Sequence, residues 1–247
     1  ALSAAAAVGA APATIAADVV YTEFGNSHNI VINEQTGFGY SVGTQTCSGG
    51  LHMIDLKDPA NPTFAGCSAT GGYCHDAECV VYDGPDKQHA GKEICFNYNE
   101  DKLVIEDVSD KKNIKTISTT PYVDNKYTHQ GWLSKDQSMV LMNDELDELQ
   151  AKSLNSKTRT MVWNLNSLAK PVHATDFMPP ANAIDHNLYI DGDLAYLSNY
   201  GDGLVVMDLS AVKDAKITRA AHFDCAQETD TSPASPPVFS GTWSNFP

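Results

Sequence analysis

The sequence predicts an all-β fold, a β-propeller built from four-stranded blades, and three observations carry this prediction. A histidine that opens an apolar run occurs at His28, His75, His129 and His186. The spacings between these histidines, 47, 54 and 57 residues, fall in the range of propeller blades. After each histidine, polar turns separate further short apolar runs that lack helical periodicity. Four complete blades are therefore expected, starting near these histidines.

Within each unit, the apolar runs give the expected strands. They are residues 28–32, 39–42, 50–56 and 63–67 in the first unit; 75–81, 94–97 and 102–108 in the second; 129–133, 139–142 and 159–165 in the third; and 186–190, 195–198 and 203–209 in the fourth. Residues 18–21 are expected to form a further strand. Near position 243, residues 241–247 match the opening of another unit, with Ser244 in the place of the histidine. A partial blade is therefore expected there.

Composition limits the classes of partner. Residues 1–17 are an alanine-rich, low-complexity lead-in, and residues 18–247 are expected to form the propeller domain. The formal net charge of −15 argues against nucleic acid as a partner, because binding to phosphates needs clustered Lys and Arg. No apolar run reaches 18 residues, so no transmembrane segment is expected.

The six cysteines, an even number, indicate an oxidising compartment. Cys47 and Cys67 flank one strand-turn-strand unit, and Cys79 and Cys95 flank the next, so each pair is expected to form a disulfide; free thiols are the alternative. Cys74 and Cys225 are left over. A bond between them would close a loop of about 150 residues and tie a later blade to an earlier one.

Several longer sequence segments resemble those of a known family, the LVIVD-repeat proteins of the choice-of-anchor B type. The resemblance covers roughly residues 27–247 and is carried by residues 27–33 (SHNIVIN), 47–55 (CSGGLHMID), 129–133 (HQGWL), 144–148 (DELDE) and 185–189 (DHNLY). It implies a secreted or surface-attached β-propeller that has seven blades in the full-length family. On that reading, this chain contains four complete blades and parts of others.

The four repeated histidines are the first candidate for chemistry. The first strand of each propeller blade lines the central channel, so the histidines that open these strands should meet near one mouth of it. Imidazole nitrogens are ligands for Zn, Cu and Fe, and His28, His75, His129 and His186 are therefore a candidate transition-metal site. In the alternative interpretation, each histidine is structural and hydrogen-bonds the neighbouring blade.

Acidic residues near the histidines form a second candidate group. Asp76, Glu78 and Asp185 could orient the imidazoles or act as hard ligands, although strand alternation places Asp76 and Glu78 on the face opposite His75. The acidic run 143–148 contributes further candidates, Asp144, Glu145, Asp147 and Glu148. Their oxygens suit a hard cation such as Ca²⁺, but their spacing differs from that of an EF-hand, and a solvated loop is the alternative.

Two functions are consistent with these features. The first is a secreted or cell-surface binding and scaffold module that presents its loops to a protein or glycan and carries a metal ion at the channel mouth. The second is a metal-dependent enzyme, an oxidase or a hydrolase, that uses the axial histidines. The chain has no nucleophile elbow and no phosphate-binding loop, which favours the first function.

Overall fold

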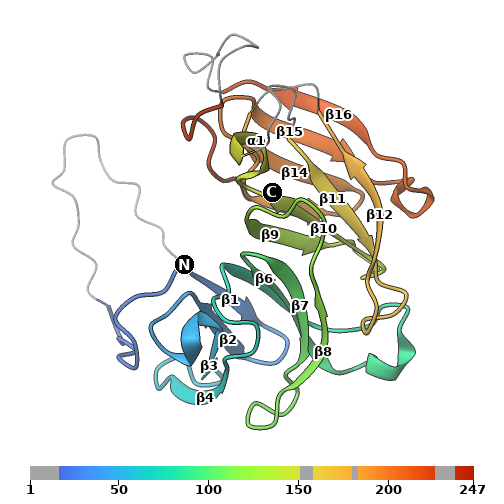
Figure 1. Ribbon diagram of the computed structural model, residues 1–247. Helices are drawn as coiled ribbons and strands as arrows, with labels where there is room; N and C mark the ends of the chain where they lie inside the picture. The colour runs from blue at the N-terminus through green and yellow to red at the C-terminus, as the bar shows by residue number, and fades with distance from the viewer. Residues whose placement is uncertain (1–16, 151–157, 180–182, 226–236) are drawn as a thin grey trace, which may run out of the picture.

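The protein is a β-propeller in which four antiparallel, four-stranded sheets follow one another along the chain (Figure 1). This computed structural model describes residues 17–150, 158–179, 183–225 and 237–247. In every sheet the strands lie in chain order, so each sheet is a simple meander. The predicted fold class and the four predicted blades are confirmed.

The strand bounds agree with the apolar runs given above, and the outermost strands of the second, third and fourth blades correspond to none of those runs. The first blade contains β1 (Asn29–Asn33), β2 (Phe38–Val42), β3 (Leu51–Asp55) and β4 (Thr63–Ser68). The second contains β5 (Asp76–Val81), β6 (Glu93–Asn99), β7 (Lys102–Asp107) and β8 (Lys115–Thr120). The third contains β9 (Thr128–Leu133), β10 (Met139–Asp144), β11 (Thr160–Asn164) and β12 (Val172–Phe177). The fourth contains β13 (Leu188–Asp191), β14 (Leu194–Asn199), β15 (Gly203–Asp208) and β16 (Thr218–Phe223).

Helical structure among the described residues is limited to short segments, namely α1 (Asp147–Gln150) and three 3₁₀ turns, Cys47–Gly49, Lys87–His89 and Val212–Asp214. None of them is long enough to cross a membrane, and the described helices include no candidate span. The strand expected at residues 18–21 is not formed, because this segment pairs with none of the sheets.

The first strand of each blade is the innermost one. Strand β1 contacts β5, β5 contacts β9, and β9 contacts β13, so these four strands lie side by side in blade order. The remaining strands of each sheet extend outward from them. The ends of the inner strands therefore place equivalent residues of successive blades next to one another.

The hydrophobic core lies between blades rather than within one sheet. On β10, Val140 and Met142 pack into the cluster shared with the second blade, whereas Met139 and Leu141 pack into the cluster shared with the fourth. Successive side chains of a strand point to opposite faces, so a strand covered on both faces is apolar at every position. This explains the continuous apolar run in the sequence of β10.

A buried ion pair of the second blade makes contacts with the first blade. Lys111 Nζ lies 2.7 Å from Glu93 Oε2 and 4.0 Å from the centre of the Phe38 ring. Glu93 Oε1 also accepts hydrogen bonds from Tyr40 Oη at 2.5 Å and from Asn33 Nδ2 at 2.9 Å. Glu93 belongs to β6, while Asn33, Phe38 and Tyr40 belong to the first blade, so this network fixes the two blades relative to each other.

The two within-blade disulfides, Cys47–Cys67 and Cys79–Cys95, are present. The expected bond between Cys74 and Cys225 is not formed, and both residues are free thiols. Cys74 is buried in the core between the first and second blades, where its thiol donates to the carbonyl of Asp76 at 3.0 Å. Cys225 is exposed and follows β16 in the fourth blade. The third blade separates the two sulfurs.

Candidate functional site

The four repeated histidines form a continuous stack at one end of the inner strands, here called the histidine row (His28, His75, His129 and His186). Neighbouring ring centres are 3.9, 4.3 and 4.2 Å apart along the row. The rings are tilted by 42–52° to one another. The structure thus brings together all four histidines that the sequence singled out.

Hydrogen bonds fix the protonation of most of the row. Nδ1 of His28 lies 3.0 Å from the carbonyl oxygen of His75, and Nδ1 of His75 lies 2.9 Å from that of His129. Nδ1 of His186 makes the same kind of contact with the carbonyl of Trp243, at 2.5 Å. A carbonyl can only accept, so Nδ1 carries a proton in each ring, and Nε2 has a free lone pair when the ring is neutral. A backbone acceptor on one ring nitrogen is also the usual arrangement in metal-bound histidines.

His129 departs from this pattern. Its side chain is 1% exposed, and neither of its ring nitrogens makes a hydrogen bond of normal geometry to the described residues, although the side chain of Asn143 lies beside it and favours its charged form. The carbonyl of His186, which the pattern would assign to His129 Nδ1, accepts instead from the side-chain amide of Asn143. A buried imidazole without partners is costly unless something else binds it. His129 is therefore the histidine of the row whose ring nitrogens are most in want of a bound ligand, because the other three each bond a backbone carbonyl.

Glu145 supplies a carboxylate beside the unpartnered imidazole. It follows the last residue of β10, Asp144, whose carboxylate accepts from the backbone N–H groups of Lys126 and Tyr127, both at 2.7 Å. The backbone N–H of Glu145 donates to the carbonyl of Tyr127 at 3.1 Å. These bonds hold the chain at the end of the inner strands and turn Glu145 toward the histidine row.

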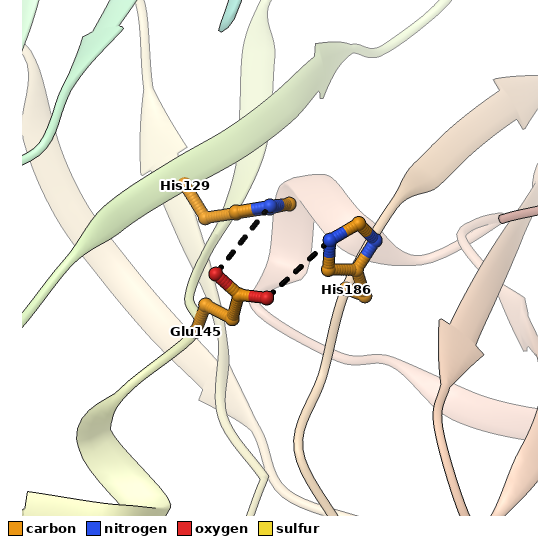
Figure 2. Close-up of side chains that lie close together, drawn as sticks. All are labelled: His129, Glu145 and His186. Atoms are coloured by element: carbon orange, nitrogen blue, oxygen red, sulfur yellow. Dashed lines mark ion pairs between the residues drawn. The ribbon is translucent and has the colours of Figure 1, made fainter. Parts of the chain in front are cut away.

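Glu145 lies between two histidines, as Figure 2 shows. Its Oε1 is 3.4 Å from His186 Nε2, and its Oε2 is 3.8 Å from His129 Nε2. Tyr200 donates a hydrogen bond to Oε1 at 3.3 Å. One ligand atom from each of His129, Glu145 and His186 lies within 4.8 Å of the others. This group, called the mouth site below, could hold a metal ion.

Burial sets the charges of the mouth site. It lowers the pKa of His186 to about 4 and, with the neighbouring imidazoles, takes the pKa of His129 well below its usual range. Burial also raises the pKa of Glu145 to about 7. Both imidazoles are therefore neutral at neutral pH, so the contacts drawn in Figure 2 are not charged pairs under those conditions. Neutral imidazoles are the form that binds metals.

The row continues beyond the fourth blade with Trp243, one position from where the sequence placed the equivalent of the histidine. Thr242 pairs with Tyr200 as Thr128 pairs with Glu100, so Trp243 takes the place that His129 has two blades earlier. Its ring centre is 5.0 Å from that of His186. The register with Ser244 in the histidine position is therefore wrong by one residue. Ser244 instead accepts a hydrogen bond from Asn187 at 3.0 Å.

Asp76 and Glu78 have partners of their own. Asp76 accepts from Asn29 Nδ2 at 2.9 Å and from the backbone N–H of Ala77 at 2.7 Å, and burial raises its pKa to about 7. Glu78 accepts from the backbone N–H of Leu133 at 2.7 Å, and burial raises its pKa to about 8. Both carboxyls thus link β5 to an inner strand of an adjacent blade.

The acidic run of the third blade divides into different environments. Asp144 anchors the connection before β9, and Glu145 faces the histidines. Asp147 and Glu148 begin α1, where burial and their mutual repulsion raise the pKa of Glu148. Burial and the carboxylate of Glu148 raise the pKa of Asp185 well above its usual range. Asp185 immediately precedes His186, so this second group lies beside the mouth site.

The sequence named all three residues of the mouth site but did not group Glu145 with the histidines. The signal that could have grouped them is a second repeated position, the residue directly after the second strand of each blade. Gly43, Glu100, Glu145 and Tyr200 follow β2, β6, β10 and β14. These residues come from equivalent points of the blades, as the histidines do.

Comparisons with known proteins agree on the fold. No protein-family model matches the chain, and no curated protein matches it. A periplasmic gluconolactonase from Pseudomonas aeruginosa has a TM-score of 0.56 at 10% identity, over 78% of this chain and 55% of that one. A protein from Lactobacillus plantarum has a TM-score of 0.55 at 15% identity, over 79% and 56%. A hypothetical selenium-binding protein from Sulfolobus tokodaii has a TM-score of 0.54 at 13% identity, over 84% and 52%.

At these identities the similarity supports the fold alone. The chain spans slightly more than half the length of these three structures.

Proposed function

We propose that this chain is part of a secreted or cell-surface β-propeller that binds a transition metal, Zn, Cu or Fe, at the mouth site. The observation that carries the proposal is His129, a buried imidazole whose two nitrogens make no hydrogen bond of normal geometry to the described residues while a carboxylate oxygen lies 3.8 Å from Nε2. Two neutral imidazoles and one carboxylate are a common donor set for Zn²⁺ and for Fe²⁺. His28 and His75, whose backbone hydrogen bonds use Nδ1 and not Nε2, are the next donors along the row.

The proposed family and the proposed location rest on the repeated sequence segments and on the disulfides. The repeated histidine units support membership of the LVIVD-repeat, choice-of-anchor B family. Two disulfides and a net charge of −15 favour an extracellular or periplasmic setting. In this setting the propeller acts as a binding and scaffold module whose loops meet a protein or glycan partner.

A metal-dependent enzyme, a hydrolase or an oxidase, is the second candidate. The observation that favours it is the number of protein ligands, since three donors leave coordination positions open for water or substrate. In addition, a carboxyl with a pKa of about 7 can accept or donate a proton at neutral pH.

Elemental analysis tests the metal. Purified protein dialysed against Zn²⁺, Cu²⁺ or Fe²⁺ and then against buffer should retain about one transition metal per chain. The double variant His129→Gln, His186→Gln should lose it. The matched control is His173→Gln, because His173 is a half-exposed histidine on the outer strand β12. A parent protein that keeps no transition metal, or a double variant that keeps as much as the parent, would contradict the proposal.

A further inference from the structure

A cavity lies at the end of the inner strands opposite to the histidine row. It has a volume of about 320 Å³, and side chains of three successive blades line it. We call it the distal cavity (Glu78, Val80, Trp132, Lys135, Ile190 and Asp191). Ile190 lies four residues after His186, which corresponds to about 13 Å along an extended chain. The distal cavity is therefore separate from the mouth site.

One wall of the distal cavity is apolar. Val80, Trp132 and Ile190 lie near the ends of β5, β9 and β13 and are partly buried. The ring of Tyr189 packs edge-on against the indole of Trp132, with the ring centres 4.9 Å apart. This contact holds the indole in place at the cavity. A ligand can therefore pack an apolar surface against a preformed aromatic wall.

Glu78 adds a neutral hydrogen-bonding group to the cavity. Its Oε2 accepts from the backbone N–H of Leu133 at 2.7 Å, and no hydrogen bond within the described part of the chain uses its Oε1. Burial raises the pKa of Glu78 to about 8, so the carboxyl holds a proton at neutral pH. Because Oε2 already accepts, the proton belongs on Oε1, which can donate to a ligand. In this form Glu78 needs no counter-charge.

Two exposed residues at the rim complete the polar part of the cavity. Asp191 is the last residue of β13, and Lys135 lies in the turn after β9. The carboxylate can accept hydrogen bonds, and the ammonium can donate them. Gln137, which also lines the cavity, is held by the backbone N–H of Asp83, which donates to its Oε1 at 2.7 Å. A cavity whose walls are fixed in advance loses less entropy when a ligand binds.

We infer that the distal cavity binds a neutral sugar ring, one unit of a glycan. A sugar ring has a face of C–H groups that can pack on the indole of Trp132, and hydroxyls that both donate and accept. The O–H of Glu78 supplies a donor, and the carboxylate of Asp191 supplies an acceptor. A purely apolar ligand would leave these polar groups without partners, and a metal ion would find a protonated carboxyl.

This inference deepens the glycan-binding part of the proposed function, on which it rests, and it is independent of the transition metal. The two sites lie at opposite ends of the same inner strands. A glycan at the distal cavity would touch three successive blades, because Glu78, Trp132 and Asp191 belong to the second, third and fourth.

Saturation-transfer difference NMR tests the site with four probes, the methyl glycosides of glucose, galactose, mannose and N-acetylglucosamine. At least one should bind the parent protein, and the protons of one sugar face should receive the strongest signal. Trp132→Leu removes the aromatic wall, and Asp191→Ala removes the acceptor at an exposed position where folding is not at risk. Each should weaken binding by about tenfold or more. The matched control is Asp193→Ala, an exposed aspartate two residues further on, which should bind as the parent does.

Glu78→Gln tests the neutral donor, because the amide can still accept from Leu133 and still donate into the cavity. It should keep the affinity of the parent protein. Three outcomes would overturn the assignment: no probe binds the parent protein, both Trp132→Leu and Asp191→Ala bind as the parent does, or Glu78→Gln loses binding.

The double variant His129→Gln, His186→Gln separates the distal cavity from the mouth site. It should bind the glycoside as the parent protein does, even if it no longer retains a transition metal. A parent protein that retains metal but binds no glycoside would overturn this inference alone. A parent protein that binds a glycoside but retains no metal would support it and contradict the metal proposal alone.

Discussion

The imidazole of His75 joins the second blade to the third. Its Nδ1 lies 2.9 Å from the carbonyl oxygen of His129, and the two rings are 4.3 Å apart. The same bond occurs from His28 to His75 and from His186 to Trp243. Each bond serves as an interblade contact and also leaves Nε2 free for a ligand. The structural and the metal-binding interpretations of these histidines are therefore compatible.

The structural part of this role predicts the effect of His75→Ala. The substitution leaves the buried carbonyl of His129 without its donor, which should lower the free energy of unfolding by about 1–3 kcal/mol. Urea unfolding measures this difference. His173→Ala is the control, since a half-exposed side chain on β12 should change stability by about 0.5 kcal/mol or less. Equal losses in both variants would contradict the assigned role of the His75 bond.

The contact between Glu93 and Lys111 predicts strong coupling between these two side chains of the second blade. Lys111→Met removes the cation and leaves Glu93, 6% exposed, uncompensated, which should cost about 3–5 kcal/mol. Adding Glu93→Gln to this variant removes the buried charge and should restore a large part of the loss. Urea unfolding of the two single variants and the double variant gives the coupling energy. Additive effects would show that the two side chains act independently.

Glu106 predicts a pH dependence of stability. It is fully buried and accepts from Ser68 at 2.7 Å and from Asn97 at 2.9 Å, and burial raises its pKa above 4.5. The folded protein therefore keeps this proton at a pH where the unfolded chain has lost it. It follows that this group contributes its full stability below pH 4.5 and loses it as the pH rises through the folded pKa.

Glu106→Gln should remove this contribution. The side-chain amide of Asn97, whose Oδ1 has no partner among the described residues, can flip and accept from the new amide. The parent protein should lose stability relative to the variant as the pH rises from 4.5 to neutrality. Chemical unfolding at several pH values measures the difference. A constant difference across this range would contradict the raised pKa.

The disulfide Cys79–Cys95 predicts a further loss of stability on its removal. The two residues face each other across β5 and β6 and are separated by 16 positions in the sequence. Closing a loop of this size stabilises a folded protein by about 3 kcal/mol in the chain-entropy model. The double variant Cys79→Ala, Cys95→Ala should lose about this amount in urea unfolding under non-reducing conditions. A loss below about 1 kcal/mol would mean that the cross-link has little effect on the unfolded chain.

The sequence predicted those features that depend on local pattern. Alternating apolar runs and turns located the strands, and the repeated histidines predicted which ends of the strands meet. Cys79 and Cys95 could be paired because they lie in consecutive strands of one blade. By contrast, Cys74 and Cys225 lie in different blades, and the sequence repeat gives no information about distances between residues of different blades.

Features that depend on loop conformation or strand register could not be predicted from the sequence repeat. Glu145 reaches the histidines because Asp144 binds the backbone of Lys126 and Tyr127, and no repeat in the sequence encodes these bonds. The placement of Trp243 depends on the pairing of Thr242 with Tyr200, which a search for a histidine-like phrase misses by one residue. Tertiary hydrogen bonds determine both positions.

The stacking of Trp243 on His186 predicts an optical signal for the mouth site. The indole ring centre is 5.0 Å from that of the imidazole, and the planes are inclined by 32°. Cu²⁺ bound at Nε2 of His186 should quench Trp243 strongly. Trp163 and Trp132 lie further along other strands, β11 and β9, and should respond less.

Titration of Cu²⁺ into the parent protein should therefore lower the tryptophan emission. Trp243→Phe should abolish most of this quenching while the protein still retains metal by elemental analysis, and Trp132→Phe, the matched control, should preserve it. Quenching that persists in Trp243→Phe would place the bound metal away from His186.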